Sequence, residues 1–343
     1  MPIINFHVYS YRIEKLMLQS KKNKSGKLFF VIKLFLALLA LWFVYLKIIN
    51  HESSGDYLSQ MQTALRQPGS VTLFVAVFLL MFLNWFTEAI KWKFMIDKIE
   101  SVTTGRALEA VFSGITISFF TPNRIGEYAG RVFHLTKGKR MQATLITVIE
   151  NSSQLLVTII SGSIASILFM HEYMELSPWI FQLMRILFIL LSMLSFILFF
   201  NIDLFEKIFQ RFITTDYWKK IIHVFSLYTT GDLLKVFLLS IGRYAVFSLQ
   251  FYLLLRAYGS YFSPGDGILM IALTFFVMSV VPTFTFAEIG IRSAVSAFFF
   301  GKLTADVLPV LNAAFSLWLI NLALPALLGA IFIFNFKLEK NGK

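Results

Sequence analysis

Long apolar runs, separated by short polar and basic stretches, dominate the chain. Six of them are long enough to cross the hydrocarbon core of a bilayer, which takes about 20 residues of α-helix. They cover residues 28–49, 70–90, 141–170, 179–201, 233–255 and 305–334. The pattern predicts an all-α polytopic integral membrane protein with about six full transmembrane helices.

Two further apolar regions, 107–136 and 266–301, are interrupted near the middle by proline and by charged residues. Backbone groups that a proline leaves unpaired cannot face lipid, so they must be buried in protein or line a wet cavity. Each region is therefore predicted to form a re-entrant hairpin of two broken helices. The predicted breaks are Pro122 and Gly126 in the first hairpin and Pro282 and Gly290 in the second.

The two interrupted regions share a motif. Both read a proline followed by Glu-x-x-x-Arg, formed by Pro122, Glu127 and Arg131 in the first and by Pro282, Glu288 and Arg292 in the second. Three predicted full spans separate the copies, and an odd number makes their orientations opposite. An inverted repeat of broken helices indicates a transporter with a site near the membrane midplane.

The positions of the basic residues predict the segments of the chain and its orientation in the membrane. We expect a basic cytoplasmic N-terminal segment at 1–27, one transmembrane domain at 28–336 and a cytoplasmic tail at 337–343. The domain divides into a first half (about 28–201), an interfacial connector (202–231) and a second half (about 232–336). Because strongly basic loops stay on the cytoplasmic side, this arrangement predicts a multi-pass protein of the cell (inner) membrane with both termini in the cytoplasm.

Composition narrows the possible functions. The chain is 57% hydrophobic and only 15% charged, with a mean hydropathy of +0.72, whereas soluble domains carry about 25% charged residues. The net charge of +12 sits mostly at the ends of apolar runs, which suits anionic lipid headgroups rather than nucleic acid. The chain has no cysteine and no nucleotide-binding motif. We expect no cofactor, no metal site and no enzymatic activity.

Several polar residues lie inside the apolar regions. A charged side chain at the centre of a transmembrane helix costs about 2.5–3.5 kcal/mol on insertion scales, so such residues normally face a partner, a cavity or a substrate. The candidate substrate-binding residues are Arg124, Glu127, Arg131, Glu150, Asn151, Gln154, Arg243, Glu288 and Arg292. Alternatively, each Glu-x-x-x-Arg motif is an ion pair along one helix that only braces its hairpin.

On these motifs the chain resembles the lysylphosphatidylglycerol synthase transmembrane family, the flippase-like domain of the multiple peptide resistance factor. The resemblance rests on the stretches at 122–131, 150–154 and 288–292, and it spans nearly the whole chain. It implies a bundle that moves aminoacylated or otherwise modified phospholipids between leaflets. Full synthases add a soluble aminoacyl-transferase domain, and this sequence ends at Lys343 soon after its last apolar run, so synthase activity is not expected.

Three functions remain open at this point. The first is a flippase for a phospholipid-like, aminoacylated or lipid-linked substrate, with arginines binding the phosphate and glutamates balancing them or receiving an amine. The second is an intramembrane transferase acting on a lipid-linked headgroup or sugar, with Glu127 or Glu150 as general base. The third is a non-transporting lipid-binding scaffold for a separate synthase or envelope enzyme.

Overall fold

The computed structural model describes residues 54–121, 123–212, 215–282 and 285–335, and all regular secondary structure there is helical. The predicted first span (28–49), the basic N-terminal segment and the tail lie outside the described residues. Among those described, five helices are long and apolar enough to cross a membrane. These are α3 (Ser70–Ile96), α6 (Arg140–Tyr173), α7 (Pro178–Phe200), α10 (Thr230–Ala257) and the continuous helix Leu308–Ile333. The chain is therefore an all-helical, multi-pass membrane protein.

Helix boundaries follow local backbone chemistry. Thr229 and Asp232 form a capping box at the start of α10, in which each side chain accepts the other residue's backbone N–H. Pro178 opens α7, where its missing N–H has no helical partner to lose. The helix α3 runs to Ile96, six residues beyond the predicted end at residue 90. The predicted end was wrong because the run stopped before Lys91, a residue type that normally faces water, whereas its side chain is fully buried.

Each interrupted region forms two helices joined by a break. The first pair is α4 (Thr104–Ser118) and α5 (Gly126–Val132), and the second is α11 (Pro264–Val280) and α12 (Thr285–Phe300). Asn123 and Arg124 in the first break have φ values of 49° and 56°, in the left-handed region. Pro282 lies in the second break, while Pro122 lies outside the described residues. Gly290 lies inside α12, so its prediction as a break was wrong: a single glycine leaves the helical hydrogen bonds intact.

In each helix pair, the residues before the first helix lie close to the residues at the end of the second helix. The backbone N–H and the hydroxyl of Thr136, after α5, donate to Glu100 Oε2 before α4, over 3.1 and 2.8 Å. The rings of Phe262, before α11, and Phe300, at the end of α12, have centroids 5.3 Å apart. Both regions therefore fold as closed hairpins, and α6, α7 and α10 lie between them in the sequence.

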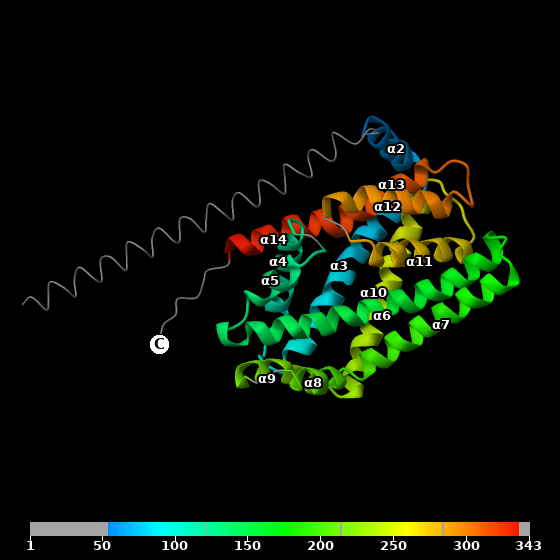
Figure 1. Cartoon of the computed structure of the whole chain (residues 1–343). Coiled ribbons are helices and arrows are strands. Elements are labelled where there is room, and N and C mark those ends of the chain that lie inside the picture. The colour runs from blue at the N-terminus through cyan, green and yellow to red at the C-terminus, as the bar shows by residue number, and fades with distance from the viewer. Residues whose placement is uncertain (1–53, 122, 213–214, 283–284, 336–343) are drawn as a thin grey trace, which may run out of the picture.

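Figure 1 shows the arrangement of the remaining helices. The helices α6 and α7 run side by side, and α10 packs against α3. Two short helices, α8 (Asp203–Gln210) and α9 (Asp216–Ile222), form the connector at one end of the long helices. The helix α2 (Ser54–Arg66) precedes α3 and contacts it. Of the residues in α7, only Phe199 is buried, so most of the surface of this helix is exposed.

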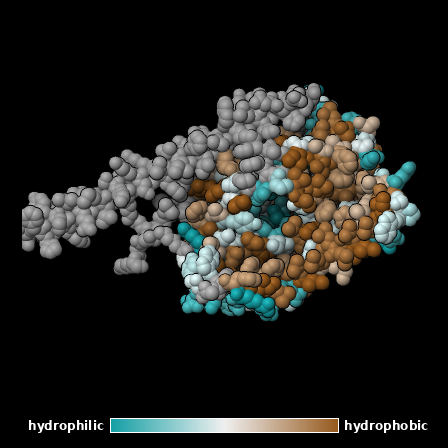
Figure 2. Space-filling model, viewed as in Figure 1, coloured by the Kyte–Doolittle hydropathy of each residue, from teal (hydrophilic) through white to brown (hydrophobic). Residues whose placement is uncertain are grey.

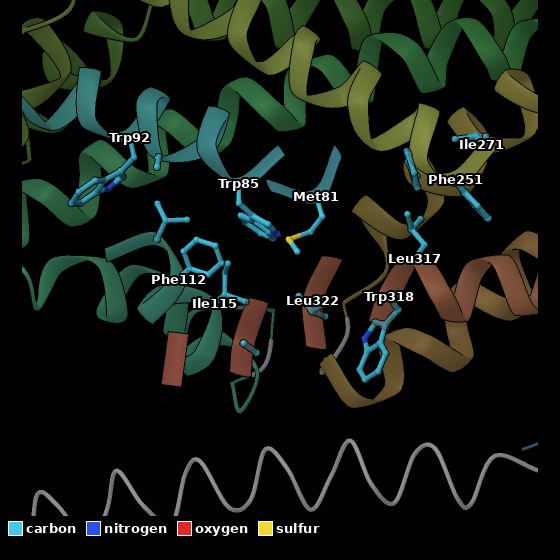
Figure 3. Packing of buried hydrophobic residues seen from close by; sticks show 14 of the residues in the cluster. Met81, Trp85, Trp92, Phe112, Ile115, Phe251, Ile271, Leu317, Trp318 and Leu322 are labelled. Atoms are coloured by element: carbon cyan, nitrogen blue, oxygen red, sulfur yellow. The ribbon is translucent and has the colours of Figure 1, made fainter. Parts of the chain in front are cut away.

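The core lies between α3, α4, α10 and the last long helix. Trp85 of α3 points toward Phe112 of α4, with ring centroids 6.4 Å apart (Figure 3). The same view shows Met81, one turn earlier on α3, beside Trp85, and Leu322 of the last long helix belongs to the same buried cluster. These side chains are all at most 7% exposed, so the hairpin α4–α5 is fixed to the long helices through an apolar interface.

Close backbone contacts hold α4 on two sides. A Cβ atom on Gly130 of α5 would lie 2.5 Å from Gly114 Cα, and one on Gly329 would lie 2.0 Å from the carbonyl oxygen of Phe112. Thr116 Oγ1 also donates to the carbonyl of Ala326 over 2.7 Å. Only glycine permits helices to approach this closely, so α4 is tightly packed against both α5 and α14 (Leu324–Asn335).

The predicted last span at 305–334 is one continuous helix with an irregular turn. It consists of α13 (Leu308–Trp318), a π-helical turn at Leu319–Ala323, and α14. Pro325 has no N–H, so the carbonyl of Asn321 loses its regular partner. The wider turn, in which the N–H of Leu324 bonds to Leu319, directs Asn321 toward the neighbouring helices, where the side chain of Asn84 donates to it over 3.4 Å.

Candidate functional site

Arg131 of α5 is fully buried and lies at the centre of a group of charged side chains. Its Nη2 donates to Glu88 Oε1 over 2.6 Å and its Nη1 to Glu150 Oε2 over 2.9 Å. Glu127, four residues earlier on the same helix, also accepts from Arg131. The spacing of four residues places Glu127 and Arg131 on one helical face, while α3 and α6 supply the other two carboxylates.

Lys91 and Arg243 complete this group. Lys91 Nζ lies 3.0 Å from Glu88 Oε2 and 2.7 Å from Glu150 Oε1, and Arg243 Nη1 lies 3.1 Å from Glu88 Oε2. We call the six residues the Arg131 cluster: Glu88, Lys91, Glu127, Arg131, Glu150 and Arg243. Three acidic and three basic side chains make the cluster formally neutral, which is the condition under which buried charges are tolerated.

A second, smaller group joins the two hairpins. Arg124, in the break between α4 and α5, donates through Nη2 to both oxygens of Glu288 in α12, over 2.9 and 2.8 Å. Arg292, one turn after Glu288, donates to Glu288 Oε1 over 2.5 Å. We call Arg124, Glu288 and Arg292 the Arg292 cluster. It carries one acidic side chain against two basic ones.

A cavity of about 490 Å³ is lined by Arg243 of the Arg131 cluster and by all three residues of the Arg292 cluster. Its polar wall contains Arg124, Gln154, Arg243, Glu288 and Arg292, and its apolar wall includes Phe247, Phe275, Val280, Val281 and Leu322. The break at Pro282 and the π-helical turn at Asn321 both contribute to the lining. The interruptions in the helices therefore lie at the cavity, where freed backbone groups avoid lipid.

The molecular surface near the cavity also combines hydrophilic and hydrophobic residues. Figure 2 shows hydrophilic residues gathered in a hollow at the middle of one face, with hydrophobic residues around it. In the same view of the cartoon, the inner ends of the two hairpins approach each other in this part of the molecule (Figure 1). A polar hollow on an apolar face can hold a polar group while leaving an attached apolar group outside.

The structure separates the nine candidate residues into two groups. Arg124, Gln154, Arg243, Glu288 and Arg292 line the cavity. Glu127, Arg131, Glu150 and Asn151 do not, and three of these belong to the Arg131 cluster. Both copies of the Glu-x-x-x-Arg motif form an ion pair along one helix, and only the second copy lines the cavity.

Sequence reasoning missed Glu88 and Lys91, which are 1% and 0% exposed. A signal was present, because the two residues stand three apart at the end of an apolar run, on one helical face. It also missed Trp85, which lines the cavity, with the guanidinium carbon of Arg243 5.1 Å from its ring centroid. An aromatic residue in an apolar run carries no pattern that marks it as part of a site.

Every carboxylate of the Arg131 cluster is engaged by a basic side chain. In the part of the chain that the structure describes, no group of three or more His, Cys, Asp or Glu side chains is arranged to hold a metal ion. The cavity wall combines guanidinium groups, amides, indoles and the paired carboxylate of Glu288 with apolar side chains. This chemistry binds polar and anionic groups by hydrogen bonds.

Long apolar helices, two closed hairpins and a cavity lined by charged side chains define a polytopic membrane protein with a polar site. The chain belongs to the family described as lysylphosphatidylglycerol synthase TM region, whose family model matches residues 30–329. No curated protein and no solved structure matches the chain. Membership of this family gives the protein a function related to membrane lipids.

Proposed function

We propose that this protein is a lipid flippase that moves a phospholipid-like substrate across the cell (inner) membrane. The observation that carries the proposal is the cavity, whose lining combines three arginines with a set of apolar side chains. A lipid headgroup in transit needs polar partners inside the membrane, and its acyl chains need an apolar path alongside. Family membership supports a lipid substrate.

The two hairpins supply the position of the proposed substrate site. We place them as re-entrant elements of an inverted repeat whose breaks meet near the midplane, since such breaks mark the sites of many transporters. Arg124 and Glu288 join the hairpins across the cavity over 2.8 Å. A phosphate that enters the cavity competes with Glu288 for the same guanidinium groups, and arginine forks bind phosphate in a bidentate manner.

Topology and partners follow from the same proposal. Both termini lie in the cytoplasm, and the connector lies in the cytoplasmic interface, where its basic residues meet anionic headgroups. These residues are Lys207, Arg211, Lys219 and Lys220, all exposed. The protein moves its substrate without modifying it, and a separate synthase or envelope enzyme supplies or uses that lipid.

The test is leaflet exchange of fluorescent phospholipids by the purified protein in liposomes. Arg124→Gln and Arg243→Gln, which each remove one positive charge from the cavity wall, should slow exchange at least about tenfold, the effect of losing one charge-assisted hydrogen bond. Arg185→Gln is the matched control, because Arg185 is an exposed residue of α7 that does not line the cavity. Arg185→Gln should exchange lipid at the normal rate.

Two results would favour the other functions. Exchange no faster than in empty liposomes, from protein that remains folded, contradicts the flippase proposal and favours a scaffold. Turnover of a lipid headgroup by the purified protein, lost in Glu150→Gln, favours a transferase.

A further inference from the structure

The cavity wall is rich in hydrogen-bond donors. Among the described residues, six buried atoms on lining side chains that can donate have no hydrogen-bond partner: Arg292 Nε, Arg292 Nη1, Arg243 Nε, Trp85 Nε1, Trp318 Nε1 and the hydroxyl oxygen of Tyr244. Arg292, the residue with two of them, is only 6% exposed. Leaving a buried donor unpaired is costly. The wall is therefore suited to a ligand that brings acceptors.

Acceptors for a cationic ligand are scarce in the same wall. Glu288 is the only acidic residue among the described lining residues. Its Oε1 already accepts from Arg124 and Arg292, over 2.9 and 2.5 Å, and its Oε2 accepts from Arg124 over 2.8 Å. Asn84 Oδ1 and the hydroxyl oxygen of Tyr244, both uncharged, are the lining acceptors among the described side chains that are buried without a partner. An ammonium group entering here would lose its hydration and find three arginines nearby.

The net charge of the two clusters also favours an anionic ligand. Together they contain five basic side chains and four acidic ones, a formal excess of one positive charge. An uncompensated charge inside the membrane is unfavourable. A ligand with a single negative charge brings the two clusters to neutrality, whereas a zwitterionic or cationic headgroup does not.

We infer that the cavity selects a phosphodiester headgroup that carries one net negative charge and no amine. This inference rests on the proposed function, because it names the substrate class of the same site. The phosphate oxygens accept from Arg292 and Arg243, and neutral hydroxyl groups of the headgroup contact Asn84 Oδ1 and Gln154. Aminoacylated and ethanolamine headgroups are rejected because their ammonium group has no free carboxylate to meet.

Binding and transport are measured separately. Lipids with eight-carbon chains and three headgroups, namely phosphatidylglycerol, phosphatidylethanolamine and lysylphosphatidylglycerol, are titrated into the purified full chain in detergent, with binding followed by the midpoint of thermal unfolding. We expect phosphatidylglycerol to bind at least about tenfold more tightly than either amine-bearing lipid, since the difference includes at least one charge-assisted hydrogen bond. Equal or tighter binding of an amine-bearing lipid, or no binding of phosphatidylglycerol, overturns the inference.

Leaflet exchange of the same three headgroups then distinguishes the two claims. Selective binding without exchange contradicts the flippase and leaves the ligand class standing. Exchange that is equally fast for all three headgroups supports the flippase and overturns the ligand class.

A change of one residue tests the charge argument directly. Gln154→Glu has nearly the same shape and places a carboxylate near Arg243, whose Nη1 lies 3.4 Å from Gln154 Oε1. The variant removes the excess positive charge and supplies an acceptor, so its preference for phosphatidylglycerol over lysylphosphatidylglycerol should fall about tenfold or reverse. Arg185→Gln removes one positive charge away from the cavity and should keep the preference. An unchanged preference in folded Gln154→Glu overturns the inference.

Discussion

The two Glu-x-x-x-Arg motifs have identical spacing and different surroundings. Arg131 is fully buried and pairs with three carboxylates from three helices, whereas Arg292 pairs with one carboxylate on its own helix and lines the cavity. The number of carboxylates around each arginine separates the two roles. In the Arg131 cluster the carboxylates equal the basic side chains in number, and the arginine holds helices together. In the Arg292 cluster there are fewer carboxylates than arginines, so an arginine can bind an external anion.

The largest effect expected from this comparison is on stability. Arg131→Gln leaves Glu88, Glu127 and Glu150 with less compensating charge inside the protein, and breaking a buried ion pair from one side typically costs about 3–5 kcal/mol. Thermal unfolding in detergent, followed by circular dichroism, should show a large fall in the midpoint. Arg292→Gln is the matched variant and should fall much less; equal losses would remove the distinction between the motifs.

For lipid transport, in contrast to stability, we expect the substitution in the second motif to have a large effect. Arg292→Gln removes the guanidinium group with two unpartnered nitrogen atoms, so lipid exchange should slow about tenfold to a hundredfold, the range for losing hydrogen bonds to a charged group. Its unfolding midpoint should stay close to that of the natural sequence. Arg292→Lys keeps the charge without the fork and should retain part of the activity. Full activity in Arg292→Gln would show that the second motif does not contact the substrate.

Gly130 and Gly290 allow the tightness of packing in the two hairpins to be compared. Gly130→Ala in the first hairpin forces a Cβ to within 2.5 Å of Gly114 Cα, and overpacking of this kind typically costs about 1–3 kcal/mol. Gly290→Ala in the second hairpin meets nothing within 4 Å, so stability should stay the same or rise by up to about 1 kcal/mol. Unfolding midpoints measured side by side test both. A similar loss in the two variants would mean that the second hairpin is packed as tightly as the first.

The smallest effect concerns the link between the hairpins. Arg124 is 40% exposed, so its pair with Glu288 is partly screened and should contribute about 1 kcal/mol or less. A double-mutant cycle with Arg124→Gln and Glu288→Gln measures this coupling from unfolding free energies. A coupling of zero would show that the two hairpins are held together by other contacts.

The sequence was sufficient to predict the helical membrane fold and the two interrupted regions. Apolar run length determines where helices can span, and proline marks where they break, so α6, α7 and the break at Pro282 were found within a few residues. The end of α3 was misplaced because a lysine at the end of an apolar run normally faces water. Lys91 instead pairs with Glu88 and Glu150, and long-range pairing of this kind leaves no trace in local periodicity.

The site was predictable only in part, for a related reason. The spacing of four residues correctly joined Glu127 to Arg131 and Glu288 to Arg292, because both partners lie on one helix. The partner of Arg243 is Glu88 of α3, and no pattern within α10 identifies it. Which of the two motifs faces a cavity depends on side chains from several other helices, so it could be decided only from the structure.

The glycine contacts around α4 have a consequence for how this sequence can change during evolution. What a side chain would meet at Gly130 and Gly329 is mostly backbone of Gly114 and Phe112, and a compensating substitution cannot remove backbone atoms. A neighbouring residue therefore cannot rescue a change at either position. Relatives that keep this helix arrangement should retain glycine there whatever lipid they handle, while lining residues such as Gln154 remain free to vary with the substrate.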